Sequence, residues 1–147
     1  MKEKKKIVVA VSGYFNPLHV GHLEMIERAR KLGNHLVAIV NNDRQVKLKG
    51  RVPFMKQADR MKIVKSLRDV DEVFLSIDKD KSVCASLAKL KPDIFAKGGD
   101  RNVGNIPEVA VCRKYRIKII DGLGKKIRSS SILIKNASTK KKYAGKN

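Results

Sequence analysis

A pair of histidines near the start of the chain is the first feature that points to chemistry. His19 and His22, two of the three histidines present, flank Gly21 in the stretch "SGYFNPLHVGH". Imidazoles donate hydrogen bonds to phosphate oxygens and stabilise the charge that builds on them in a transition state. The pair therefore indicates a phosphate-binding site. In the alternative interpretation, one histidine caps a helix and the other is merely exposed. The presence of two histidines at a strand exit favours the phosphate-binding site.

The neighbouring residues place this pair between a strand and a helix. The apolar run "KIVVAV" predicts a buried strand, and residues 21–32 predict a helix with one apolar stripe. His22 then lies in the first turn of that helix, where backbone N–H groups and the helix dipole favour an anion. Gly13 permits a tight turn after the strand, and Gly21 leaves room for a phosphate against the backbone.

The rest of the chain alternates between strands and helices. We expect further strands at residues 35–41, 72–77, 93–97 and 117–120, and further helices at 55–67, at 81–90, from Pro107 and from Ser130. Residues 42–53 are polar and basic and are expected to form a loop. This alternation predicts an α/β fold, a single Rossmann-like doubly wound domain with a five-stranded parallel sheet. Such sheets bind ligands at the carboxyl ends of their strands, where the winding direction switches.

The net charge of the chain indicates which class of partner it binds. Thirty-four Lys and Arg residues against fourteen Asp and Glu residues give a formal charge of +20. This charge favours anionic partners such as nucleotides, phosphorylated metabolites, RNA or acidic lipid. Residues 1–6 and 137–147 are expected to be solvated basic tails on a domain spanning 7–136.

Cysteine content and hydropathy indicate the compartment. Cys84 and Cys112 are too few for a disulfide framework and too far apart for a metal motif, so we expect two buried free thiols in a reducing cytoplasm. No apolar run approaches the ~20 residues that a membrane-spanning helix needs. We therefore expect a cytoplasmic protein without a membrane span.

Several stretches resemble those of the cytidylyltransferase-like nucleotidyltransferase superfamily. Its members carry His-x-Gly-His after the first strand, as in "GYFNPLHVGH". In addition, "RQVKLKGR" resembles their mobile basic loop, "MKQADR" the next helix with its arginine, and "SSSILIK" the serine-rich start of their last helix. "DIFAKGGDR" is similar to the Lys-Gly-Gly-Asp stretch of the heptose 1-phosphate adenylyltransferases. Those enzymes and the glycerol-3-phosphate cytidylyltransferases are the nearest in motifs.

The resemblance implies a reaction. These enzymes transfer a nucleoside monophosphate from CTP or ATP to a phosphorylated small alcohol or sugar and release pyrophosphate. The acceptor oxygen attacks the α-phosphorus directly, so catalysis consists of positioning and charge stabilisation. Mg²⁺ is expected on the triphosphate, held mainly by substrate oxygens and water, with no protein metal ligands.

The resemblance also assigns roles to residues. His19 and His22 would hold the triphosphate, and Lys49 would bridge the phosphates of the acceptor and the triphosphate. Ser130 would donate to the β- and γ-phosphates. Tyr14 and Phe15 would line the nucleotide with their backbone. The full set of expected nucleotide-binding residues is Gly13, Tyr14, Phe15, Gly21, Gly98, Asp100, Arg101, Ser129 and Ser131.

Each assignment has a simpler alternative. Lys47, Lys49 and Arg51 could form an ordinary solvated loop. The serines at 129–131 could serve simply as a helix cap. A helix cap is compatible with phosphate binding. Residues 97–105 could be only a turn.

The base, the acceptor and the assembly are left open. Arg101 stands where the heptose enzymes have tyrosine, which is compatible with an additional phosphate or carboxylate on the acceptor. A basic nucleic-acid-binding module without catalysis is the alternative function, although few aromatic residues and no recognisable motif support it. Members of the superfamily are commonly dimers, so a homodimer is expected. Candidate apolar contacts, most of them expected to pack against their own sheet, are Val64, Leu67, Val109 and Val111.

Overall fold

The core of the protein is a parallel sheet, seen in a computed structural model that describes residues 5–98 and 106–123. Within these ranges the strands are β1 (Val8–Gly13), β2 (His35–Val40), β3 (Glu72–Leu75), β4 (Ile94–Ala96) and β5 (Lys118–Ile120). They pair in the order β3-β2-β1-β4-β5, and every pair is parallel. The predicted fold class and five-stranded parallel sheet are confirmed.

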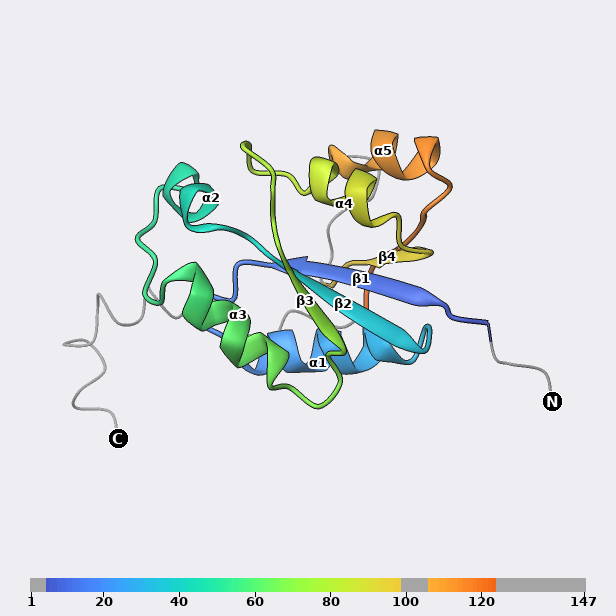
Figure 1. Cartoon of the computed structure of the whole chain (residues 1–147), viewed down its shortest axis with the longest axis horizontal. Coiled ribbons are helices and arrows are strands. Elements are labelled where there is room, and N and C mark those ends of the chain that lie inside the picture. Colours follow the sequence, from blue (N-terminus) through green and yellow to red (C-terminus); the bar gives the residue numbers. More distant parts are fainter. Residues whose placement is uncertain (1–4, 99–105, 124–147) are drawn as a thin grey trace.

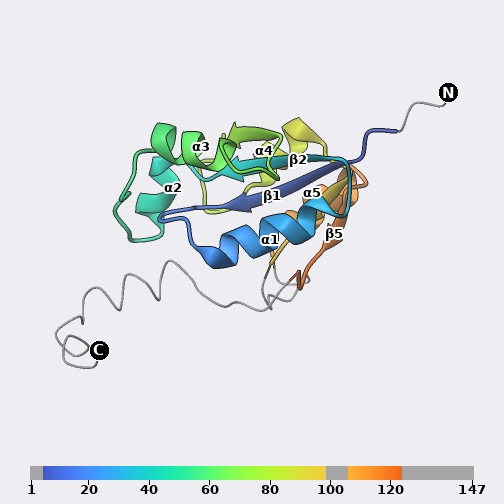
Figure 2. The same ribbon diagram turned by 90° about the horizontal axis from the view of Figure 1, so that it is seen from below.

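Helices cover both faces of this sheet. They are α1 (Val20–Arg30), α2 (Asp43–Leu48), α3 (Gln57–Lys65), α4 (Cys84–Leu90) and α5 (Glu108–Lys114). Figures 1 and 2 show α1 and α3 on one face and α4 and α5 on the other. None of these helices is long and apolar enough to cross a membrane. The helix expected from Ser130 lies outside the described residues.

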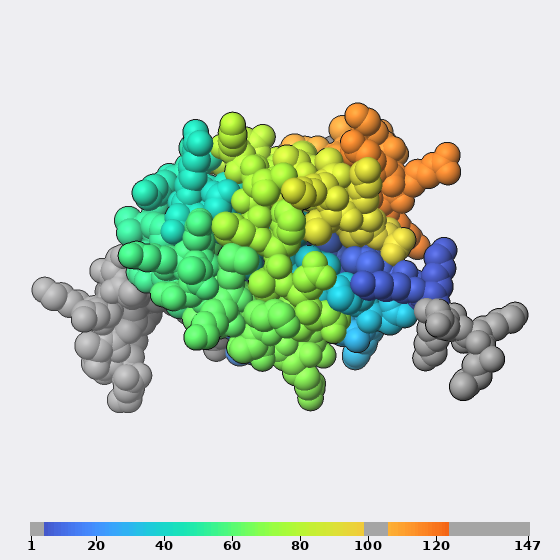
Figure 3. Space-filling view, in the orientation of Figure 1, coloured from blue at the N-terminus to red at the C-terminus, as the bar shows by residue number. Residues whose placement is uncertain are grey.

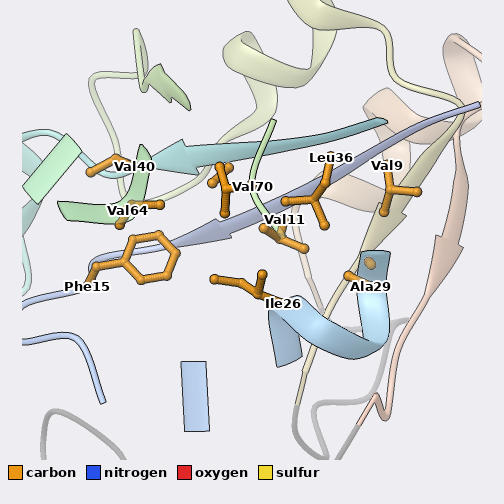
Figure 4. Packing of buried hydrophobic residues seen from close by; sticks show 11 residues of the cluster. Val9, Val11, Phe15, Ile26, Ala29, Leu36, Val40, Val64 and Val70 are labelled. Atoms are coloured by element: carbon orange, nitrogen blue, oxygen red, sulfur yellow. The ribbon is translucent and has the colours of Figure 1, made fainter. Parts of the chain in front are cut away.

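Alternation along the strands produces one hydrophobic core on each face. In β1, Val9 and Val11 pack toward α1 and α3, whereas Ala10 packs toward α4 and α5. Figure 4 shows the first core, where Ile26 of α1 and Val64 of α3 meet the side chains of β1 and β2. Val64 is thus fully buried in its own domain and is not available to an interface between subunits.

The expected loop at residues 42–53 is partly helical, which corrects the prediction. The Asn42 side chain accepts from the Gln45 N–H, and the Gln45 side chain accepts from the Asn42 N–H. This reciprocal pair is a capping box, and it starts α2. Residues 49–53 then form the connection to α3.

The two thiols differ in burial. Both cysteines are free, but Cys112 is buried whereas Cys84 is only half-buried, so the expectation of two buried thiols is wrong for Cys84. Burial raises the pKa of the Cys112 thiol to about 11 and also raises the pKa of Cys84. Because a thiolate is the reactive form, neither residue is set up as a nucleophile.

The winding direction switches between β1 and β4, since β2 and β3 lie on one side of β1 and β4 and β5 on the other. Loops leaving the carboxyl ends of β1 and β4 therefore flank the switch point, where open parallel sheets bind ligands. The chain leaves β1 and β2 toward the end of the molecule that carries α2 and the start of α3 (Figure 1). Figure 3 shows α2 and α3, in teal to green, covering this end of the visible face.

Candidate active site

His19 and His22 together cap the helix that follows the switch-point loop. The Nδ1 atom of His19 accepts from the Gly21 N–H at 3.1 Å, and the Nδ1 atom of His22 accepts from the His19 N–H at 3.1 Å. The two rings stack with centroids 3.7 Å apart and planes inclined by 25°. The capping alternative for this pair is therefore realised, and by both histidines at once.

The capping bonds also define the protonation of the rings. A neutral imidazole that accepts at Nδ1 carries its hydrogen on Nε2. Burial, with a further contribution from His19, lowers the pKa of His22 to about 3, so this ring is neutral near pH 7. Capping uses Nδ1, whereas phosphate binding would use Nε2–H. The same two side chains are therefore compatible with both roles.

Phe15 shapes the loop between β1 and the histidines. Its backbone is in the left-handed region, with φ of 50°, and its side chain is buried. The ring lies 4.8 Å from that of His22 and covers Gly13, where an added Cβ would come within 2.8 Å of the Phe15 Cζ atom. Gly13 thus makes room for Phe15, whose ring points into the core (Figure 4). Only the backbone of Phe15 is placed to line a ligand.

Lys49 lies over the same loop. It caps the C-terminal end of α2, and its Nζ atom is 4.4 Å from the centroid of the Tyr14 ring. The fold therefore brings a lysine from the segment after β2 next to the segment after β1. This cation–π contact places the ammonium group at the carboxyl end of the sheet.

Asn16 holds the connection after α2 beside this loop, a role that the sequence does not indicate. It is buried; its amide donates to the Val52 carbonyl at 3.1 Å, and its side-chain oxygen accepts from the Phe54 N–H at 2.7 Å. An asparagine followed by proline signals only a turn. Its partners lie more than thirty residues away, which no local pattern reveals.

Arg60, the arginine of "MKQADR", is buried inside the site's framework. It donates to the Tyr14 and Asn41 carbonyls and pairs with the Asp43 carboxylate. A side chain with no exposed surface does not contact a bound nucleotide in this arrangement. Arg60 therefore contacts the framework of the site and not a ligand-facing surface.

The remaining candidates fall into two groups. Gly98 follows β4 and lies against Met25 of α1, on the other side of the switch point. Asp100, Arg101, Ser129, Ser130 and Ser131 lie outside the described residues. Among the residues at 5–98 and 106–123, no group of three or more His, Cys, Asp or Glu side chains is arranged to hold a metal ion.

Comparison with known proteins adds a family to this geometry. Residues 10–136 match the protein family described as cytidylyltransferase-like. The FAD synthase of Thermococcus sibiricus is 41% identical over 104 residues, which is 69% of each chain. The bifunctional protein HldE of Streptomyces coelicolor is 34% identical over 138 residues, covering 89% of this chain and 28% of that protein. The crystal structure of a lipopolysaccharide core biosynthesis protein from Thermoplasma volcanium superposes with a TM-score of 0.68 at 26% identity, covering 80% of this chain and 96% of that one.

Proposed function

The chain belongs to the cytidylyltransferase-like family of nucleotidyltransferases, and from this premise we propose that it transfers a nucleoside monophosphate from a nucleoside triphosphate to the phosphate group of a small acceptor. Family membership makes the chain an enzyme, so the alternative of a binding module without catalysis is set aside. The observation that carries the proposal is the stacked pair of histidines, with both Nδ1 atoms engaged in capping, at the switch point of the sheet.

The proposed chemistry is a direct displacement. An oxygen of the acceptor phosphate forms a bond to the α-phosphorus, the bond from that phosphorus to the bridging oxygen breaks, and pyrophosphate leaves with the electron pair. Charge on the phosphate oxygens rises during this step. The Nε2–H groups of His19 and His22 would stabilise that charge, and Lys49 would bridge the two substrates.

The proposal also gives roles to residues outside the described ranges. Ser130, with Ser129 or Ser131, would donate to the β- and γ-phosphates, and Asp100 or Arg101 would contact base, ribose or acceptor. Mg²⁺ would accompany the triphosphate through substrate oxygens and water.

ATP and flavin mononucleotide are the substrates that we place first. The support is twofold. Relatives at about 40% identity are named FAD synthases, and FAD is flavin mononucleotide joined to AMP through a diphosphate. In addition, Val52 and Phe54 are 77% and 61% exposed, beside Asn16 and next to the cation Arg51. Apolar side chains interleaved with cations suit an acceptor that combines a flat ring with a phosphate.

A phosphorylated sugar or polyol is the second candidate acceptor. The match to HldE extends over 89% of the chain. The Lys-Gly-Gly-Asp stretch at residues 97–100 also favours this acceptor through its similarity to the heptose enzymes.

A substrate panel tests the proposal. ATP and CTP are each combined with flavin mononucleotide, a sugar 1-phosphate and glycerol 3-phosphate, and pyrophosphate release is measured. We expect the highest kcat/KM for ATP with flavin mononucleotide, with FAD as the second product. Folded protein that releases no pyrophosphate with any pair would refute the proposed function.

A further inference from the structure

Arg60 is the largest fully buried side chain among the described residues, and it carries a permanent charge. A guanidinium group remains protonated in proteins, so its burial requires both a counter-charge and hydrogen-bond acceptors. The acceptors that Arg60 uses identify what it holds in place.

Its Nη1 atom joins the segments that follow the neighbouring strands β1 and β2. It donates to the Tyr14 carbonyl at 2.7 Å and to the Asn41 carbonyl at 2.6 Å. Tyr14 follows β1 and carries the ring beneath Lys49, and Asn41 follows β2. One guanidinium nitrogen therefore sets the separation of the segments that follow β1 and β2.

Its other nitrogens bind the first residue of α2 and the segment just before α3. Nη2 donates to Asp43 Oδ1 at 2.7 Å, and Nε donates to the Met55 carbonyl at 3.0 Å. Asp43 is the first residue of α2, and its Oδ2 atom accepts from the Gln57 N–H at the start of α3. The start of α2 is thereby tied to β1, β2 and α3, and α2 carries Lys49 at its other end.

We propose that Arg60 is a positioning residue that holds Lys49 and the Tyr14–Phe15 backbone in register with the histidines; this rests on the proposed nucleotide site. A buried ion pair is a weak source of stability compared with well-packed apolar side chains. An apolar side chain of similar size would fill the same space but would release three carbonyls and Asp43. What Arg60 supplies beyond packing is the relative placement of four segments around the site.

The test compares Arg60→Lys with a core variant of matched stability. Lysine keeps the charge, but its single ammonium group lacks the planar fork that reaches all four acceptors. Leu87→Ala, in the core on the opposite face, lowers stability without touching these loops. Urea unfolding, the Kd for ATP by calorimetry and kcat/KM are measured for both. We expect Arg60→Lys to lower kcat/KM by about a hundredfold per folded molecule, as small misplacements do. Leu87→Ala should stay within twofold of the parent.

A double-mutant cycle with Lys49→Ala separates positioning from a purely structural role. If Arg60 acts through Lys49, the two losses in kcat/KM should be strongly non-additive, because a misplaced lysine contributes little that can be removed. Additive losses, or an Arg60→Lys variant that is unstable yet binds ATP and turns over like the parent, would overturn the proposal.

A second variant decides the case if Arg60→Lys does not fold. Asp43→Asn retains the size of the side chain but removes the counter-charge, and a rise of tenfold or more in the Kd for ATP is expected, whereas an unchanged Kd would contradict the proposal. Calorimetry needs no acceptor. A parent that binds ATP but transfers nothing would refute the proposed reaction while leaving the role of Arg60 testable.

Discussion

At the scale of single residues, the geometry of the histidine pair is compatible with helix capping and with phosphate binding at the same time. Each ring uses one nitrogen for the helix start and has its other nitrogen protonated as a result. A capping bond thereby selects the tautomer that the proposed phosphate contact requires. If the proposed function is right, removing either ring affects both the helix and the chemistry, and the two effects have to be measured separately.

Asparagine at position 19 separates them. Asparagine is among the best N-cap residues, so His19→Asn should keep the bond to Gly21 and cost less than about 1 kcal/mol of stability. It lacks the Nε2–H donor, and kcat should fall by about two to three orders of magnitude. The measurement is kcat alongside the urea midpoint. A His19→Asn enzyme with the parent's kcat would reduce His19 to a cap.

The lowered pKa of His22 predicts how stability depends on pH. The pKa is about 3 in the folded protein and 6.5 in the unfolded chain, so between these values the unfolded state binds the additional proton. Stability from this group is therefore complete above about pH 6.5 and falls as the pH drops, by up to about 1.4 kcal/mol per pH unit. Urea unfolding at pH 7.5 and pH 5 measures the loss.

The matched variants are His22→Asn and His35→Gln. His22→Asn should lose much of this pH dependence. His35 lies at the amino end of β2 and contacts Glu72, far from the switch point, and His35→Gln should keep it. Equal pH dependence in the parent and in His22→Asn would contradict a neutral His22 in the folded protein.

At the scale of elements, the strands and most helices could be predicted because their signals are local. Apolar runs and apolar stripes depend on neighbouring residues, and all five strands were expected within about two residues of their bounds. Helix α2 is not predicted because it is short and lies within a polar, basic stretch, although the spacing of Asn42 and Gln45 is a capping signature. Asn16 and Arg60 could not be predicted as framework residues, since their partners come from distant segments.

Lys49 caps the C-terminal end of α2. Lys49 is exposed, so Lys49→Ala should leave the free energy of unfolding within about 0.5 kcal/mol of the parent's value. If Lys49 bridges phosphates, the same change should raise KM for the triphosphate or the acceptor by about tenfold or more. Steady-state kinetics with each substrate varied provide the measurement.

Lys62→Ala is the control for this charge change. Lys62 is an exposed lysine in the last turn of α3. Its substitution by alanine removes the same charge without changing the lysine that lies over Tyr14. Equal effects of the two substitutions would indicate that the overall field of the protein matters and that Lys49 has no bridging role.

At the scale of the whole molecule, the net charge of +20 disfavours association between two copies of the chain, whereas exposed apolar side chains favour it. Val64 is buried, and Leu67 and Val111 pack against the two cores, so these positions are poor candidates for an interface. Ile63 on α3 and Ile77 after β3 are 37% and 49% exposed. We propose a homodimer that uses such exposed side chains away from the histidines.

Light scattering at micromolar concentration tests this proposal. The dimer mass of about 33 kDa, twice the 16.5 kDa chain, is expected at physiological salt, where repulsion between like charges is screened. Dissociation is expected to increase as salt is lowered. A monomer mass at both salt concentrations would exclude the dimer.

Nucleotidyl transfer requires cleavage between the α- and β-phosphates of the triphosphate. Phosphorus NMR of the protein with ATP, Mg²⁺ and flavin mononucleotide follows every phosphate in one experiment. Transfer of AMP predicts that the three ATP resonances and the phosphate monoester resonance of flavin mononucleotide are replaced by those of pyrophosphate and of a diphosphate diester, with the two products in equal molar amounts. His19→Asn should produce the same products about a hundredfold or more slowly. ADP and inorganic phosphate as the products would place the cleavage at the γ-phosphate and would contradict nucleotidyl transfer.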